Sequence, residues 1–213
     1  DKVRLLVRTD DVHGLRLFDT NLQSSHGIEA LGFKRILWFN LLTMTYLDAL
    51  DLYEDSRKVI HMVFYDCRDI SFDDVGISER MAESLDHYRK KTGFKEINSL
   101  SDIIVWLAIR GFKINICLDE KQSREDGVKN FLDKLNISNQ DSIHIYTKRL
   151  GGSMHKKALI TPYAVIQGSA NLTYSGTTLN EEIINFASYG SSEYDEMNIN
   201  IQDTFYGAKR WIK

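Results

Sequence analysis

The residues best suited to chemistry lie close together in the second half of the chain. His155 and Lys157 are two positions apart. Gly168, Ser169 and Asn171 follow after a short interval. An imidazole can act as a nucleophile or an acid, while an ammonium, a hydroxyl and a carboxamide can each donate hydrogen bonds. One nucleophile or acid with three donors suits a tetrahedral, anionic phosphoryl group.

Two apolar runs, Ala158–Ile160 and Ala164–Ile166, separate the two halves of this set. Each run is short enough for a strand, and Pro162 and Tyr163 stand between them. This pattern predicts a tight hairpin.

One register of that hairpin would gather the polar side chains on one face. Alternate residues of a strand point to the same side. If His155 faces Asn171, then Lys157 faces Ser169, and all four share a face. That register requires a three-residue loop, Pro162–Ala164, and a slip of one residue would send the pairs to opposite faces.

Helices and strands alternate in the region before this segment. Apolar residues recur twice at helical spacing, which predicts two helices. They are Leu100, Ile103, Ile104, Leu107 and Ala108 in the first, and Val128, Phe131, Leu132 and Leu135 in the second. Ser99 or Ser101 is suited to cap the first helix, and Gly111 to end it.

Three strands are expected among these helices. Val59–Tyr65 forms a buried apolar run, and Phe112–Leu118 alternates between apolar and polar residues. Ile143 and Ile145 indicate a short strand that ends near Tyr146. Strands and helices that alternate in this way predict an α/β fold with a mixed sheet.

The first half of the chain shows weaker patterns. Ile36–Leu50 is apolar with too many polar interruptions for a strand, so we expect it to be mostly helical. Residues 69–98 are charged, with Met81, Leu85 and Tyr88 at helical spacing. They predict a helical insertion between the first core strand and the next helix.

Composition limits the class of protein. The 213 residues are 43% hydrophobic, and 27 Lys and Arg against 30 Asp and Glu give a net charge of −3. Disorder, collagen and a long coiled coil are excluded, and so is a dedicated non-specific nucleic-acid coat. Cys67 and Cys117 form no disulfide framework or metal-site spacing. No apolar run of membrane-spanning length and no signal-peptide pattern occurs, so we expect a cytoplasmic protein without stable membrane association.

The spacing His155-x-Lys157 with Gly168-Ser169-x-Asn171 resembles the HKD motif of the phospholipase D superfamily. The order of elements upstream is similar as well, including the glycine pair just before Met-His-x-Lys. The resemblance implies a phospholipase D-like mixed sheet flanked by helices on both faces.

The resemblance covers about residues 56–190, which we take as the core of one phospholipase D-like domain, 1–213. Within it, residues 69–98 form the helical insertion of the first half. Residues 1–55 form an N-terminal extension whose sequence indicates no role.

The sequence departs from the family pattern in two places. The Asp that follows the motif Lys by five residues is Pro162 here. In the family that Asp supports the structure and does not contact the phosphate. The interval from Lys157 to Gly168 is also one residue shorter than usual, and a three-residue hairpin loop would absorb the difference.

The resemblance implies a phosphodiester exchange in two steps. One His attacks phosphorus and forms a phosphohistidine, while a second His protonates the leaving oxygen and then activates water. Lys157 and Asn171 would hold the non-bridging oxygens with Ser169, and no metal or other cofactor is required. Glu182 lies where the family carries a Glu that bonds a His ring, and Glu181 is the competing candidate.

Only one such motif is present, because none of the other five His has a Lys two residues on. Single-motif members of the family build the site between two subunits. We therefore expect a homodimer through the motif face, with its twofold axis between the two copies of His155.

The stretch that follows the motif resembles phospholipase D-like proteins of prokaryotic DNA-modification and phage-defence clusters. Partner proteins of such a system are therefore candidates. Lys148, Arg149 and Lys156 are candidates for binding flanking phosphates of a nucleic acid. Tyr146 and Tyr174 are near enough in sequence to stack on bases, and equally suit the core or its rim.

Three hypotheses about function remain open at this point. The first is a metal-independent nuclease or phosphodiesterase acting on DNA or RNA. The second is a catalytically weak or inactive nucleic-acid-binding or assembly subunit that keeps the fold. The third is a phospholipid phosphodiesterase, for which the sequence offers no convincing amphipathic docking helix.

Overall fold

The structure is a computed structural model. It describes residues 3–8, 15–20, 55–71, 98–137, 141–149, 156–162, 164–169, 171–173, 175 and 184–211. The predictions for Ile36–Leu50, and for most of the insertion at 69–98, lie outside these residues.

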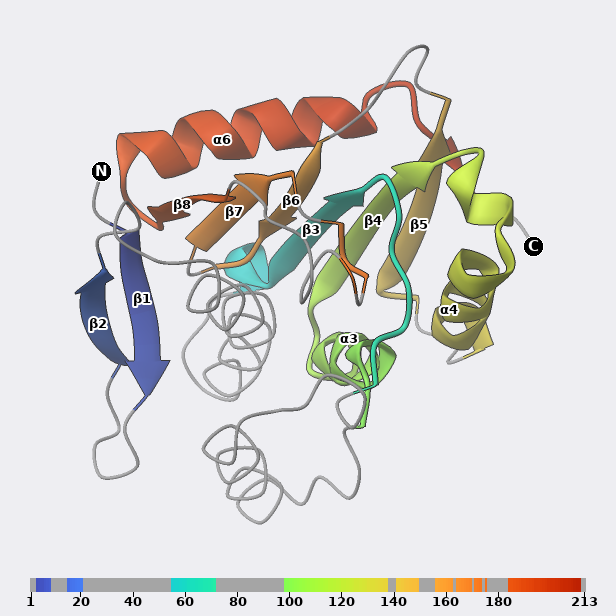
Figure 1. Ribbon diagram of the computed structural model, residues 1–213, viewed down its shortest axis with the longest axis horizontal. Coiled ribbons are helices and arrows are strands. Elements are labelled where there is room, and N and C mark those ends of the chain that lie inside the picture. The colour runs from blue at the N-terminus through green and yellow to red at the C-terminus, as the bar shows by residue number, and fades with distance from the viewer. Residues whose placement is uncertain are drawn as a thin grey trace.

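A seven-stranded mixed sheet forms the centre of the molecule, in the order β8-β7-β6-β3-β4-β5-β9 (Figure 1). The strands are β3 (Val59–Phe64), β4 (Lys113–Asp119), β5 (Ile143–Lys148), β6 (Lys157–Ile160), β7 (Ala164–Gly168), β8 (Ile184–Ser188) and β9 (Lys209–Arg210). The first three run parallel, and each of the other four runs antiparallel to the strand that it joins. A separate antiparallel pair consists of β1 (Val3–Arg8) and β2 (Leu15–Thr20).

Helices cover both faces of this sheet (Figure 1). They are α3 (Leu100–Ile109) and α4 (Asp126–Ile137) on one face and α6 (Ser192–Gln202) on the other, with short 3-10 turns η2 (Asp55–Arg57), η3 (Gln122–Arg124) and η4 (Asp203–Phe205). Alternate strand residues supply the two cores: Met62 and Ile116 pack with α3 and α4, while Val63 and Cys117 pack with α6. The expected mixed sheet flanked by helices on both faces is confirmed.

The first crossover helix begins with a capping box. The backbone N–H of Ser99 donates to Oδ2 of Asp102 at 2.9 Å. This reciprocal bond stabilises the first turn, so Ser99 is the cap. Ser101 instead donates its hydroxyl to Asp69 at 2.9 Å. The helix ends before Gly111, whose φ of 87° lies in the left-handed region that glycine tolerates best.

The predicted strands and helices occur close to their expected positions. The predicted register of the hairpin, however, is wrong by one residue. Lys157 lies opposite Gly168 and not opposite Ser169. The backbone N–H of Thr161 donates to the carbonyl of Ala164 at 2.9 Å, which leaves a loop of two residues where three were expected. Pro162, whose ring fixes φ at about −65°, takes the first position of this loop, as it does in type I and type II turns.

His61 is half-buried between the sheet and the C-terminal turns. Its ring packs edge-on to Phe205 at a centroid distance of 5.3 Å, and Nδ2 of Asn115 lies 3.5 Å from its Nδ1. Burial, with the nearby charge of Lys113, lowers the pKa of His61 to about 4. The ring is therefore neutral at neutral pH.

This lowered pKa predicts a pH-dependent stability. The unfolded chain binds a proton at His61 near pH 6.5 while the folded chain does not until about pH 4. The contribution of the neutral His61 ring to the free energy of unfolding is complete above pH 6.5 and is lost as the pH falls toward 4. Between pH 7 and pH 5 the loss is about 2 kcal/mol. Urea unfolding of wild type and His61→Gln should show that their difference in free energy of unfolding shrinks by this amount, and a constant difference would contradict the assignment.

Candidate active site

Both halves of the motif lie at one edge of the sheet. The parallel strands β3, β4 and β5 end at this edge, where α/β proteins place their ligands. The chain enters β6 here at Lys157 and leaves β7 here at Gly168. Ala158 lies opposite Val63, so Lys157 is level with Phe64 at the end of β3.

Lys157 is buried although it carries a charge, with 3% of its surface exposed. Its Nζ lies 5.8 Å from the centre of the Tyr65 ring, within range of a cation–π interaction. Burying an ammonium costs free energy unless nearby groups compensate it. The fold therefore places a cation at this edge. Water screens it poorly, so its attraction for a bound anion would be strong.

Asn171 is held at the same place by the loop after β3. Its Oδ1 accepts a hydrogen bond from the backbone N–H of Asp66 at 3.2 Å. The next residues pair as well, since the N–H of Arg68 donates to the carbonyl of Leu172 at 3.0 Å. Because the oxygen of the carboxamide faces Asp66, its NH2 group is the part that can donate to an anion.

Ser169 is exposed and directly follows the last residue of β7. The expected cross-strand pair of Lys157 and Ser169 does not form, because the two-residue loop shifts the register. The strand ends at Gly168, so the alternation on which the shared-face prediction rested does not extend to Ser169 or Asn171. Asn171 reaches the site through its bond to the loop after β3 and not through the hairpin.

His155, Glu182 and its competitor Glu181 lie outside the described residues. Their roles stay predictions. The same holds for Tyr174 as a stacking residue.

Two of the three predicted phosphate-binding cations bind the C-terminal segment, residues 200–206. The Nζ of Lys148 donates to the carbonyls of Thr204 at 3.1 Å and Tyr206 at 2.8 Å. The Nζ of Lys156 donates to the carbonyl of Asn200 at 3.1 Å. Arg149 is exposed at the end of β5. Contact of any of the three with nucleic acid stays a prediction.

Tyr146 packs within the molecule. Its ring meets that of Phe205 edge-on, with a centroid distance of 5.7 Å. It also lies against the core on the α6 face. Of the two alternatives for this residue, the structure supports the rim of the core.

A cation that the sequence analysis did not single out lies beside Asp66, whose backbone binds Asn171. Arg68 forms two hydrogen bonds of 3.2 Å to the carboxylate of Asp66, and 51% of its side chain is exposed. Its stem lies against Gly127, where an added Cβ would come within 3.3 Å. The available signal was positional, because residues that follow a parallel strand lie at the ligand-binding edge.

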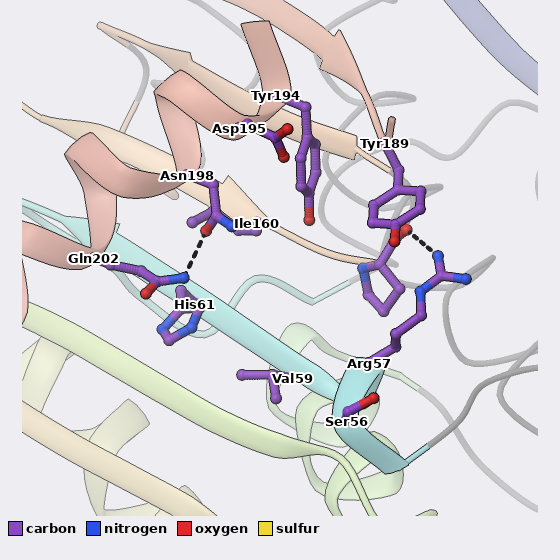
Figure 2. Close-up of a pocket in the computed structure, with 11 residues that line it drawn as sticks. Ser56, Arg57, Val59, His61, Ile160, Tyr189, Tyr194, Asp195, Asn198 and Gln202 are labelled. Atoms are coloured by element: carbon purple, nitrogen blue, oxygen red, sulfur yellow. Dashed lines mark hydrogen bonds between the residues drawn. The ribbon is translucent and has the colours of Figure 1, made fainter. Parts of the chain in front are cut away.

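A pocket of about 280 Å³ lies at the opposite edge of the sheet, near the start of β3 (Figure 2). Two of its polar side chains bond to the hairpin. Arg57 donates to the carbonyl of Pro162 at 2.9 Å and lies 4.1 Å over the ring of Tyr189. The hydroxyl of Tyr194 donates to the carbonyl of Thr161 at 2.9 Å. These contacts fasten α6 to the hairpin, far from Lys157.

Two further findings concern the described residues alone. They contain no group of three or more His, Cys, Asp or Glu side chains arranged to hold a metal ion. None of their helices combines the length and hydropathy that crossing a membrane requires.

Comparison with solved structures gives the same fold. Nuc from Salmonella typhimurium, described as a phospholipase D family member, is 17% identical, with a TM-score of 0.53 over 80% of this chain and 91% of that one. NucT from Helicobacter pylori is 14% identical, with a TM-score of 0.51 over 84% of this chain and 94% of that one. No curated protein sequence matches the chain.

A family model described as "Cardiolipin synthase, PLD-like domain" matches residues 91–203, which is more than half of the chain. The match spans Lys157 and Asn171, the two motif residues that the structure brings to the end of β3. The chain therefore belongs to the phospholipase D superfamily, as a protein with a PLD-like domain.

Proposed function

We propose that the chain is a metal-independent phosphodiesterase that cleaves DNA or RNA through a covalent phosphohistidine, at a site shared by two subunits. The observation that carries the proposal is the convergence of the Lys157 ammonium and the Asn171 carboxamide at the end of β3. His155 precedes Lys157 by two residues in the sequence. Family membership supports the same chemistry.

The reaction that this arrangement suits has two balanced steps. In the first, a ring nitrogen of His155 attacks phosphorus, the bond to the leaving oxygen breaks, and the second subunit's His155 gives that oxygen a proton. In the second, the second subunit's His155 takes a proton from water, which attacks phosphorus and breaks the P–N bond. Glu182, or Glu181 in its place, would bond the His ring and fix its tautomer.

The fixed donors would do the electrostatic work of the reaction. Negative charge grows on the non-bridging oxygens as phosphorus becomes five-coordinate. Lys157 is buried, so its charge acts through a medium of low polarity. Asn171 is positioned by the Asp66 backbone and needs no rearrangement to donate. Ser169, exposed at the end of β7, would supply a further donor.

The missing motif Asp does not weaken the proposal. Pro162, which takes its place, lies in the hairpin loop at the far end of β6 from Lys157. Five residues of extended chain separate the two by about 16 Å. At that distance Pro162 supports the fold, and its carbonyl accepts a hydrogen bond from Arg57.

Cleavage in excess EDTA is the first test. Labelled single- and double-stranded DNA and RNA should include at least one substrate that wild type cuts in EDTA. His155→Ala should abolish the cut, and Lys157→Met, which keeps the buried stem but not the charge, should slow it at least a hundredfold. His144→Ala, a nearby His on β5, serves as the control and should cut normally.

Other results would favour the remaining hypotheses. Binding without cleavage of any substrate would indicate a nucleic-acid-binding or assembly subunit. Hydrolysis confined to phosphatidylcholine vesicles would indicate a lipid enzyme, a class to which the name of the matched family model also refers. Cleavage that needs added metal, or that survives His155→Ala, would contradict the proposal.

A shared site makes a quantitative prediction about mixed subunits. If each site needs His155 from both subunits, a dimer with one His155→Ala chain is inactive. After subunit exchange, activity should fall with the square of the wild-type fraction, so equal mixing leaves about one quarter of it. A linear fall, leaving one half, would show that each subunit works alone. Light scattering should give twice the mass of the chain.

Asn171→Ala separates positioning from stability. The change removes one half-buried hydrogen bond, which should lower the free energy of unfolding by about 1 kcal/mol. Loss of a phosphate donor should also slow cleavage about a hundredfold or more. The matched control is Asn198→Ala, which removes the 2.9 Å bond from Gln202 to Asn198 at the opposite edge. If both variants cleave equally well, Asn171 has no role in the site.

A further inference from the structure

An aromatic side chain stands out from the surface where the chain leaves α6. Tyr206 follows η4 and is 87% exposed, more than any other large hydrophobic residue that the structure describes. A single exposed tyrosine has no meaning by itself. Its setting distinguishes this one, because its backbone is fixed and exposed cations occur in the adjoining segments.

The backbone of Tyr206 is tied to the end of β5. Its carbonyl accepts the 2.8 Å bond from Lys148, and its N–H donates to the carbonyl of Asp203 at 3.1 Å. Gly207 turns the chain with a φ of 72°. On the far side of β9, the N–H of Trp211 donates to the carbonyl of Ile145 at 2.9 Å, and the indole packs on the core. An exposed ring on a fixed backbone can bind a partner at little entropic cost.

Exposed cations follow this residue in the chain and lie at the end of β5. Lys209 and Arg210 form β9, and Arg149 follows β5 directly. Within the described part of the chain, no carboxylate forms an ion pair with any of the three. Asp203 lies in the same segment, and Asp119 and Glu120 adjoin Lys148 at the end of β4. The four cations Lys148, Arg149, Lys209 and Arg210 outnumber these three carboxylates, so the local balance is positive. Such a surface attracts a polyanion.

The strand register connects this surface to the candidate active site. Lys157 is level with Phe64, which pairs with Leu118 on β4, and Leu118 pairs with Thr147 on β5. Thr147 pairs in turn with Lys209. One row across the sheet thus begins at the buried Lys157, passes through the buried Phe64, Leu118 and Thr147, and ends at the exposed Lys209. It measures how far apart the two places lie along this edge. Four strand spacings make the row about 19 Å long.

We infer that Tyr206, Lys209 and Arg149 form a binding track for single-stranded nucleic acid that leads to the phosphodiester site. Tyr206 would stack on an unpaired base, whose face a duplex does not offer, and the cations would contact the backbone. The inference rests on the proposed function and adds the strandedness of its substrate. At the 3.4 Å rise of a stacked strand, 19 Å spans about six nucleotides.

Binding measured by fluorescence anisotropy tests the track. Labelled twelve-nucleotide single strands of DNA and RNA should bind wild type more tightly than the corresponding duplexes. Tyr206→Ala should weaken single-strand binding at least fivefold and leave duplex binding unchanged, while Tyr206→Phe keeps the stacking face and should bind like wild type. Tyr189→Ala, at an exposed tyrosine of the opposite edge, is the matched control and should not change the affinity.

Salt dependence tests the cations. Lys209→Glu should weaken single-strand binding and lower the slope of log affinity against log salt by about one or more. Lys129→Glu makes the same charge change on the exposed side of α4 and should leave the slope unchanged. Single strands of four nucleotides are too short to span the row. The difference in affinity between Tyr206→Ala and wild type should therefore be smaller for these strands than for the longer ones.

The failure of the track differs from the failure of the active site. Equal single-strand affinities of Tyr206→Ala and wild type, or a preference of wild type for duplex, would overturn the track. Hydrolysis of bis(p-nitrophenyl) phosphate in EDTA, lost in His155→Ala, would still support the phosphodiesterase in that case. Single-strand binding that depends on Tyr206, without hydrolysis of the small ester, would support the track and overturn the proposed activity.

Discussion

The pairing of β6 with both β3 and β7 is the constraint on which the rest of the site depends. It brings Lys157 to the end of β3 with its ammonium buried, and it turns the chain so that β7 ends at the same edge. The hydrogen bond from the Asp66 backbone then fixes Asn171 beside it. The pairing of β6 with β3 and the bond between Asp66 and Asn171 join residues that are about a hundred positions apart, so the site exists only when the whole sheet has formed. The same pairing removes the hairpin loop, and with it Pro162, from the chemistry.

The C-terminal segment connects structure and function in a second way. The Lys148 and Lys156 side chains lie next to the motif in sequence and bind carbonyls at the end of α6 and beyond it. They therefore fasten the segment that carries Tyr206 to the edge that carries Lys157. A basic cluster near a phosphodiester site can thus be structural in part. The cations left exposed, on β9 and after β5, are the ones free to meet a polyanion.

Local sequence patterns predicted most of the central strands and helices, but they could not predict contacts between residues distant in sequence. The apolar runs and caps located β3, α3, β4 and α4 because those signals are local. The predicted hairpin register was wrong because the number of loop residues depends on the pairing of Thr161 with Ala164. The local sequence does not specify that pairing. The helix α6 was not predicted, because its few apolar residues show little periodicity. Its buried Tyr194 is held by a hydrogen bond to the carbonyl of Thr161, which is distant in sequence. Of the site, the motif indicated the residue types, and only the fold could bring Asp66 to Asn171.

In the proposed reaction, His155 becomes covalently bound to phosphorus. The most direct measurement is to trap that state. Wild type is mixed in EDTA with an oligonucleotide carrying radioactive phosphorus at each linkage, quenched in alkali and digested with trypsin, which releases residues 150–156 as one peptide. Label is expected on that peptide, and none when His155→Ala is treated in the same way. Cleavage of the oligonucleotide without label on this peptide would contradict it.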